Sequence, residues 1–370
     1  MTTRIKRIIS VVGARPNYMK VAPIHRALQA YSEQVEHMLV HTGQHYGSAM
    51  SDSFFRDLAM PAPNEFLGVG SGSHAEQTAK IMIGFEQVLL KHKPHGVIVV
   101  GDVNSTLACA LTSAKLHIPV AHVEAGLRSG DKSMPEEINR LATDSIADIG
   151  YITEESALQF LRREGWSDDR LIFTGNTMID SLHHALPTAQ ALNVSSSLGL
   201  KGEEYVLCTL HRPSNVDDKE QLSMILRLLA ELAEHITLVL PLHPRTRKNA
   251  ELFGIADLLV HPRIRIIEPL GYIDFLSLLQ SACAVVTDSG GIQEETTVLG
   301  IPCFTLRPTT ERPITCDCGT NVLVVPTEHN IRQAFSAIEM RSFKQGSIPP
   351  LWDGHSAERI AHHVAMHWLS

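Results

Sequence analysis

The chain has 370 residues, of which 44% are hydrophobic and 19% charged, and its formal net charge is −8. This length fits two globular domains, and the acidic balance argues against nucleic-acid or anionic-membrane partners. No apolar run reaches the roughly 18–20 residues needed to span a bilayer, and the N-terminal segment is not typical of a signal peptide. We therefore expect a globular protein of the cytoplasm.

Strand-like apolar runs alternate with helical patterns through the first half of the chain. Strands are predicted over 8–12, 35–41, 97–100, 120–123, 149–152 and 171–173, and helices over 16–31, 75–92, 104–117, 135–147 and 154–164. Such β-α alternation is typical of a parallel, doubly wound sheet.

The pattern loosens between 176 and 203, where a polar, Gly-containing connector is expected. A second α/β series follows it, ending in an amphipathic helix over 356–368. We predict an N-terminal α/β domain over 1–180, a C-terminal α/β domain over 181–354, and a last helix, 355–370, that packs back on the first domain.

Acidic side chains follow two predicted strands of the first domain. Asp102 and Glu124 are separated by one helix, as in a βαβ unit, so both are expected at the carboxyl edge of one sheet, where ligands bind in such folds. Glu136 opens the next helix, and Arg140 lies one turn along it. Carboxylates in one crevice can divide into an acid and a base.

Polar residues also follow strands elsewhere. Arg15 comes after the first strand and can approach a diphosphate as a planar fork. His211 and Arg212 follow the strand predicted at 205–210, and a histidine there can act as a general acid.

The run Asp288-Ser289-Gly290-Gly291 joins a strand to a helix that carries Glu295. Small residues there give a ligand access to the free N–H groups of a helix start, which favour anions. The plain alternative is a helix cap. No G-x-G-x-x-G follows a strand, and the cysteines and histidines lack zinc-site spacing, so we expect no NAD, no metal and no other cofactor.

The ordered motifs resemble those of the non-hydrolysing UDP-N-acetylglucosamine 2-epimerases. They run from residue 13 to about 321: Gly13-Ala-Arg-Pro-Asn, His41-Thr-Gly-Gln-His, Gly101-Asp-Val-Asn-Ser-Thr, His122-Val-Glu-Ala-Gly-Leu-Arg-Ser, Met134-Pro-Glu-Glu-Ile-Asn-Arg, Thr209-Leu-His-Arg-Pro, Glu268-Pro-Leu, Thr287-Asp-Ser-Gly-Gly-Ile-Gln-Glu-Glu and Thr310-Glu-Arg-Pro.

The resemblance implies two Rossmann-like domains of the glycosyltransferase GT-B type with a ligand cleft between them, and a homodimer. It implies interconversion of UDP-GlcNAc and UDP-ManNAc without a cofactor, by elimination of UDP to a 2-acetamidoglucal and its re-addition. The catalytic set it implies is Asp102, Glu124, Glu136 and His211. The substrate and UDP site it implies comprises Arg15, Lys20, Arg140, Arg212, His243, Phe275, Ser289, Gly290, Gly291, Glu295 and Arg312.

Gln44 and His45 correspond to a second UDP-sugar site of bacterial members. This chain continues with Tyr46-Gly47 and has no arginine over 67–74, which argues against activation there. Four alternatives stay open: a hydrolysing epimerase, a 2-epimerase of a modified UDP-HexNAc, a GT-B glycosyltransferase, and a non-catalytic nucleotide-sugar-binding protein. The residues do not determine which carboxylate takes the C2 proton.

Overall fold

The computed structural model describes residues 5–44 and 60–368. Contacts divide the chain into two compact units, one formed by Met1–His184 with Pro350–Ser370 and the other by Ala185–Pro349. Within the described residues, no helix combines the length and apolar character needed to cross a membrane.

The described residues of the first unit form a seven-stranded parallel sheet in the order β3-β2-β1-β4-β5-β6-β7. Its strands are β1 (Lys6–Val12), β2 (Val35–His41), β3 (Glu65–Phe66), β4 (Gly96–Val100), β5 (Val120–Val123), β6 (Ile149–Ile152) and β7 (Leu171–Phe173). Its helices are α1 (Arg15–Leu28), α3 (His74–His92), α4 (Asn104–Lys115), α5 (Pro135–Ile146), α6 (Glu155–Arg163) and α16 (Ser356–Met366). The predicted doubly wound α/β fold is confirmed for this unit.

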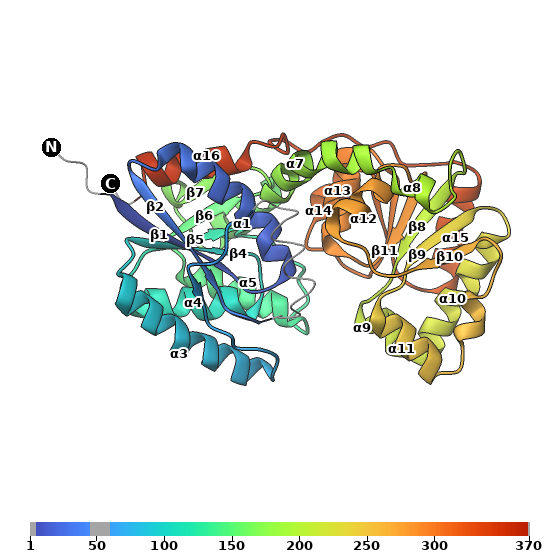
Figure 1. Cartoon of the computed structure of the whole chain (residues 1–370), viewed down its shortest axis with the longest axis horizontal. Helices are drawn as coiled ribbons and strands as arrows, with labels where there is room; N and C mark the ends of the chain where they lie inside the picture. Colours follow the sequence, from blue (N-terminus) through green and yellow to red (C-terminus); the bar gives the residue numbers. More distant parts are fainter. Residues whose placement is uncertain (1–4, 45–59, 369–370) are drawn as a thin grey trace. The chain divides into compact units, whose positions relative to one another are not determined.

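Helices cover both faces of this sheet. Helices α1 and α16 pack together on one face, and α3, α4 and α5 follow one another on the other (Figure 1). The strands between them are buried on both sides, and Ile8 and Ile9 of β1 have no exposed surface, as expected for a parallel sheet.

The second unit repeats this architecture with a six-stranded parallel sheet in the order β10-β9-β8-β11-β12-β13. Its strands are β8 (Tyr205–Thr209), β9 (Thr237–Pro241), β10 (Ile264–Ile267), β11 (Ala284–Thr287), β12 (Cys303–Leu306) and β13 (Asn321–Val324). Its helices are α8 (Val194–Ser197), α9 (Pro213–Val216), α10 (Lys219–Ala233), α11 (Pro244–Leu252), α12 (Tyr272–Leu279), α13 (Gly290–Leu299), α14 (Pro313–Asp317) and α15 (Glu328–Glu339).

Each sheet reverses its strand order once, between β1 and β4 in the first unit and between β8 and β11 in the second. Ligands of open α/β sheets bind beyond the carboxyl ends of the strands at this reversal. Asp102 follows β4, His211 follows β8 and Ser289 follows β11. The predicted motifs of each unit therefore lie at its reversal point.

One segment differs from the sequence prediction. The stretch expected to be a loose connector is largely helical, because α7 covers Thr177–Leu192 and contains Pro187. Ile179, Leu182, Ala185 and Ala189 recur at helical spacing and are fully or almost fully buried. Their burial outweighs the unfavourable proline.

Helix α16 is held at its start by a residue of α7. The Asp180 carboxylate accepts hydrogen bonds from the backbone N–H of Ser356 at 3.2 Å and of Ala357 at 2.6 Å. These N–H groups belong to the first turn of α16, where a carboxylate is favourable.

Candidate active site

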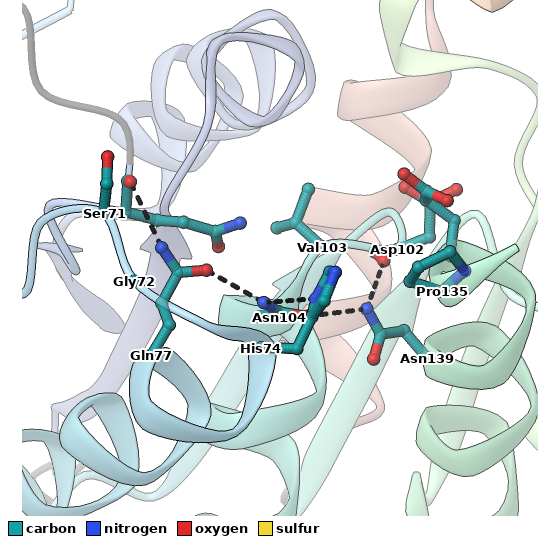
Figure 2. A pocket seen from close by; sticks show the side chains of 11 residues that line it. Ser71, Gly72, His74, Gln77, Asp102, Val103, Asn104, Pro135 and Asn139 are labelled. Atoms are coloured by element: carbon teal, nitrogen blue, oxygen red, sulfur yellow. Dashed lines mark hydrogen bonds between the residues drawn. The ribbon is translucent and has the colours of Figure 1, made fainter. Parts of the chain in front are cut away.

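A pocket of about 250 Å³ lies at the reversal point of the first sheet. It is lined by Gln44, Ser71, Gly72, His74, Gln77, Asp102, Val103, Asn104, Pro135, Glu136 and Asn139. Figure 2 shows side chains from the segment before α3, the loop after β4 and the start of α5 meeting there. Two of the predicted catalytic carboxylates, Asp102 and Glu136, therefore line one pocket.

Three amide side chains that line the pocket, those of Gln77, Asn104 and Asn139, are linked by hydrogen bonds (Figure 2). Asn104 Nδ2 donates to Gln77 Oε1 at 2.8 Å and approaches His74 Nδ1 at 3.1 Å. Asn139 Nδ2 donates to Asn104 Oδ1 at 3.3 Å and to the Asp102 carbonyl at 2.9 Å. This network holds the backbone that carries the Asp102 carboxylate.

The residue before Asp102 has a left-handed backbone conformation. Gly101 has φ +68°, and a Cβ there would lie 2.8 Å from Lys20 Nζ, so glycine is favoured. The Asp102 carboxylate pairs with Arg140 Nη1, and its side chain is 26% exposed. The charge of Asp102 is thus compensated while the group remains accessible from the pocket.

Arg140 is itself held by Glu137. Glu137 Oε2 accepts from Arg140 Nη2 at 2.7 Å, and the Glu137 carboxylate also accepts from the backbone N–H of Ser129 and of Gly130. Burial alone would raise the pKa of Glu137, but the Ser129 N–H and Arg140 outweigh it and lower that pKa. Glu137 is therefore an ionised anchor, whereas Glu136 faces the pocket.

Glu136 is half-buried in the first turn of α5. Within the described parts of the chain it makes no hydrogen bond or ion pair with another side chain. Its carboxylate is therefore available to a ligand in the pocket, which it lines together with Asp102.

Glu124 has a different environment. It follows β5 with φ +71° and forms an ion pair with Lys20, in which both side chains are buried. The parallel pairing of β4 with β5 confirms the βαβ unit predicted for Asp102 and Glu124. The pocket residues do not include Glu124, which lies beside Gly101 instead.

The fully buried His122 contacts the segment that carries Asp102 and lies in the strand that precedes Glu124. His122 Nε2 lies 2.8 Å from the Gly101 carbonyl oxygen, and Nδ1 lies 2.6 Å from Asp144 Oδ1. Burial opposes ionisation of Asp144, but His122 and Arg128 outweigh it and lower its pKa. The two ring nitrogens of His122 therefore connect the Gly101 carbonyl oxygen to the Asp144 carboxylate.

The second unit pairs its predicted histidine with an aspartate. His211 follows β8 and Asp288 follows the neighbouring β11, and His211 Nδ1 lies 2.8 Å from Asp288 Oδ1. Burial of Asp288 would raise its pKa, but hydrogen bonds from His211 and Arg212 lower it. Asp288 thus fixes the ring through Nδ1 and leaves Nε2 for chemistry. The sequence pattern assigns no separate role to Asp288, although it begins the Asp-Ser-Gly-Gly run.

The start of α13 is free of a side-chain cap. Ser289 occupies the N-cap position, but its side chain makes no capping hydrogen bond, and Gly290 and Gly291 form the first turn. Since the plain alternative for this run was a helix cap, the Ser289 side chain gives that alternative no support. The bare N–H groups of this turn favour an anion.

Glu295 lies one turn further along α13. It is buried, and burial raises its pKa to about 7, with Tyr272 lowering it and Glu294 raising it. Glu294 in turn pairs with Arg312, the Nε–Oε1 distance being 2.6 Å. The two adjacent glutamates thus have different environments, one paired with an arginine and one with a raised pKa.

The other predicted residues of the second unit lie near these groups or on the same sheet edge. His243 caps α11, and its ring centroid is 5.6 Å from that of His211. Arg212 donates its backbone N–H to Asp288. Phe275 is half-buried on α12.

The candidates for a second site are only partly described. Gln44 is buried, and its Oε1 accepts hydrogen bonds from the backbone N–H and the hydroxyl of Ser105. Its amide oxygen therefore fixes the start of α4. His45 lies outside the described residues. Arg15 begins α1, but its side chain is likewise outside the description.

Comparisons with known proteins show which proteins this chain is similar to. A sequence profile of UDP-N-acetylglucosamine 2-epimerase matches residues 26–365. The chain is 42% identical over 356 residues to the UDP-N-acetylglucosamine 2-epimerase of Methanocaldococcus jannaschii, covering 95% of this chain and 96% of the relative. It is 41% identical over 364 residues to the UDP-2,3-diacetamido-2,3-dideoxy-D-glucuronate 2-epimerase of Pseudomonas aeruginosa, covering 97% and 99%.

The crystal structure of Methanocaldococcus jannaschii UDP-GlcNAc 2-epimerase in complex with UDP-GlcNAc and UDP matches with a TM-score of 0.88 and 41% identity, covering 97% of this chain and 99% of that one. Two doubly wound parallel sheets and these similarities define an epimerase with a fold of the glycosyltransferase GT-B type. The profile spans most of the chain. The chain therefore belongs to the UDP-N-acetylglucosamine 2-epimerase family.

Proposed function

We propose that the protein interconverts UDP-GlcNAc and UDP-ManNAc by eliminating UDP and adding it back. The observation that carries this proposal is the pocket that Asp102 and Glu136 share in the first unit. The His211–Asp288 pair beside the uncapped start of α13 in the second unit supports it. The first set of groups suits proton transfer at a sugar, and the second suits a diphosphate.

In the proposed reaction the C1–O bond breaks and its electron pair leaves with UDP. Positive charge then builds on the sugar ring and makes the C2 proton easier to remove. A carboxylate takes that proton, and a C1=C2 double bond forms, giving the 2-acetamidoglucal. In the return step a proton reaches the opposite face of C2, and the same UDP oxygen attacks C1, so no atoms or electrons are lost.

We assign the proton transfers to Asp102 and Glu136, because both line the pocket and Glu136 is open to a ligand there. Glu124, buried against Lys20, then supplies fixed negative charge near the ring. His211, oriented by Asp288, stabilises the departing diphosphate together with the start of α13.

Incubation with UDP-GlcNAc in D₂O, followed by NMR, tests this proposal. We expect deuterium at C2 and formation of the manno epimer. An epimer that keeps its original C2 hydrogen would contradict the mechanism. Accumulation of free UDP and ManNAc would indicate a hydrolysing epimerase instead.

A modified UDP-HexNAc is the second candidate substrate. It is favoured by the 41% identity to the Pseudomonas aeruginosa enzyme named for a diacetamido-glucuronate. A panel of UDP-sugars in the same D₂O experiment separates the two, because only the true substrate should exchange its C2 hydrogen rapidly. A homodimer and a cytoplasmic location stay predictions of the sequence.

A further inference from the structure

Arg307, which follows β12, has a buried guanidinium with one end unpaired. The residue is 4% exposed, and its Nη2 donates to Glu311 Oε2 at 2.8 Å. Its Nη1 is buried and has no hydrogen-bond partner in residues 5–44 and 60–368. Since a buried charged donor without a partner is costly, this end indicates a group that Arg307 binds in the working protein.

The unpaired end lies against the start of α13. A Cβ at Gly290 would lie 4.0 Å from Arg307 Nη1 and 2.7 Å from Glu311 Oε1. Gly290 is therefore a glycine because the Arg307–Glu311 pair approaches the helix here. Arg307 Nη1 and the bare N–H groups of the first turn thus lie side by side.

The charges of this cluster favour an anion. Burial would raise the pKa of Glu311, but Arg307, Arg312 and Arg212 outweigh it and hold that pKa far below its usual range. Glu311 neutralises Arg307, and Glu294 neutralises Arg312. Arg212 adds a further positive charge that acts on Glu311, and its buried Nε has no hydrogen-bond partner among the described residues.

We propose that Arg307 is a diphosphate-binding residue, positioned by Glu311, that makes this unit prefer nucleoside diphosphates over monophosphates. The ligand class rests on the proposed function. The start of α13 has one set of N–H donors, and Arg307 adds a second donor next to it. Free UDP carries more charge on its terminal phosphate than a UDP-sugar does. Arg307 therefore binds the diphosphate more strongly as the C1–O bond breaks.

The test compares UDP with UMP in calorimetric titrations, without any sugar. The double variant Arg307→Gln with Glu311→Gln removes the cation without leaving a buried carboxylate unpaired. We expect the preference for UDP over UMP to fall about tenfold or more, the usual size for a lost charge-assisted hydrogen bond. Arg332→Gln, at an exposed ion pair of the same unit, is the control and should keep the preference.

An unchanged preference, or an equal loss of affinity for UDP and UMP, would overturn the inference. If the double variant does not fold, Arg307→Lys decides, because it keeps the charge but cannot reach Glu311 and a phosphate as a fork. A lysine variant with the normal preference would likewise overturn it. A wild-type protein that prefers UDP but does not epimerise would refute the proposed function and leave this inference standing.

Discussion

The Asp288 carboxylate lies 2.8 Å from His211 Nδ1 and accepts the backbone N–H of the same residue, although the two residues are 77 positions apart. The carboxylate therefore sets both the position of the histidine and the face that its ring presents. This makes Asp288 a positioning residue for His211.

We predict that Asp288→Asn lowers kcat by about 100-fold, within the range of general acid–base effects, because the amide can present a donor to Nδ1 and no longer fixes the ring. His211→Gln should lower kcat similarly. Steady-state kinetics of the double variant complete a double-mutant cycle. We expect kcat of the double variant to be little lower than that of either single variant. Fully additive losses in the free energy of activation would mean that the two residues act independently.

Glu295 should make stability depend on pH. Its folded-state pKa of about 7 is above the ordinary value of 4.5, so its contribution is fully present below pH 4.5 and is lost as the pH rises through 7. Relative to Glu295→Gln, the wild-type free energy of unfolding should fall by roughly 3 kcal/mol across this window. Urea unfolding of both proteins at pH 5 and pH 8 measures the difference, and a constant gap between them would contradict the prediction.

Removing only one partner of the Lys20–Glu124 ion pair should lower the stability of the protein. Lys20→Met leaves a buried carboxylate without its cation, and we expect the free energy of unfolding to fall by about 3–5 kcal/mol. Adding Glu124→Gln should restore much of that loss, since the buried charge is gone. Chemical denaturation of the single and double variants checks this. A double variant as unstable as the sum of the single changes would argue against the buried pair.

Asp102 should matter for chemistry rather than for nucleotide affinity. Asp102→Asn keeps the shape of the pocket and its backbone contact with Asn139. We expect C2 deuterium exchange to fall by at least about 100-fold, with UDP affinity within a factor of two or three. Asp169→Asn, at an exposed acid of the same unit, should change neither quantity. Retained exchange in Asp102→Asn would remove Asp102 from the proton-transfer steps.

The local pattern of the sequence predicted the parallel sheets and the polar residues at their carboxyl edges, because strand periodicity and turn residues are local properties. The same pattern missed α7, whose Pro187 suggests a break and whose buried face depends on packing. It also missed the partners of the predicted residues. Lys20 and Glu124 are 104 positions apart, and such pairs are set by how the strands are ordered in the sheet.

Arg307 and Glu311 illustrate the same limit. They are four positions apart outside a helix, and nothing in their spacing indicates that they reach the start of α13. Only the close approach to Gly290 reveals the relationship. The sequence therefore predicted polar motifs at the carboxyl ends of the strands, whereas the groups that hold them required the structure.

The environment of His122 gives the protein an internal reporter. A ring hydrogen on either nitrogen is enclosed against the Gly101 carbonyl or the Asp144 carboxylate, and the side chain has no exposed surface. Hydrogens held in this way exchange slowly with solvent and resonate far downfield of the amide envelope. A proton spectrum would show, without substrate or turnover, whether the loops carrying Asp102 and Glu124 are intact in any variant.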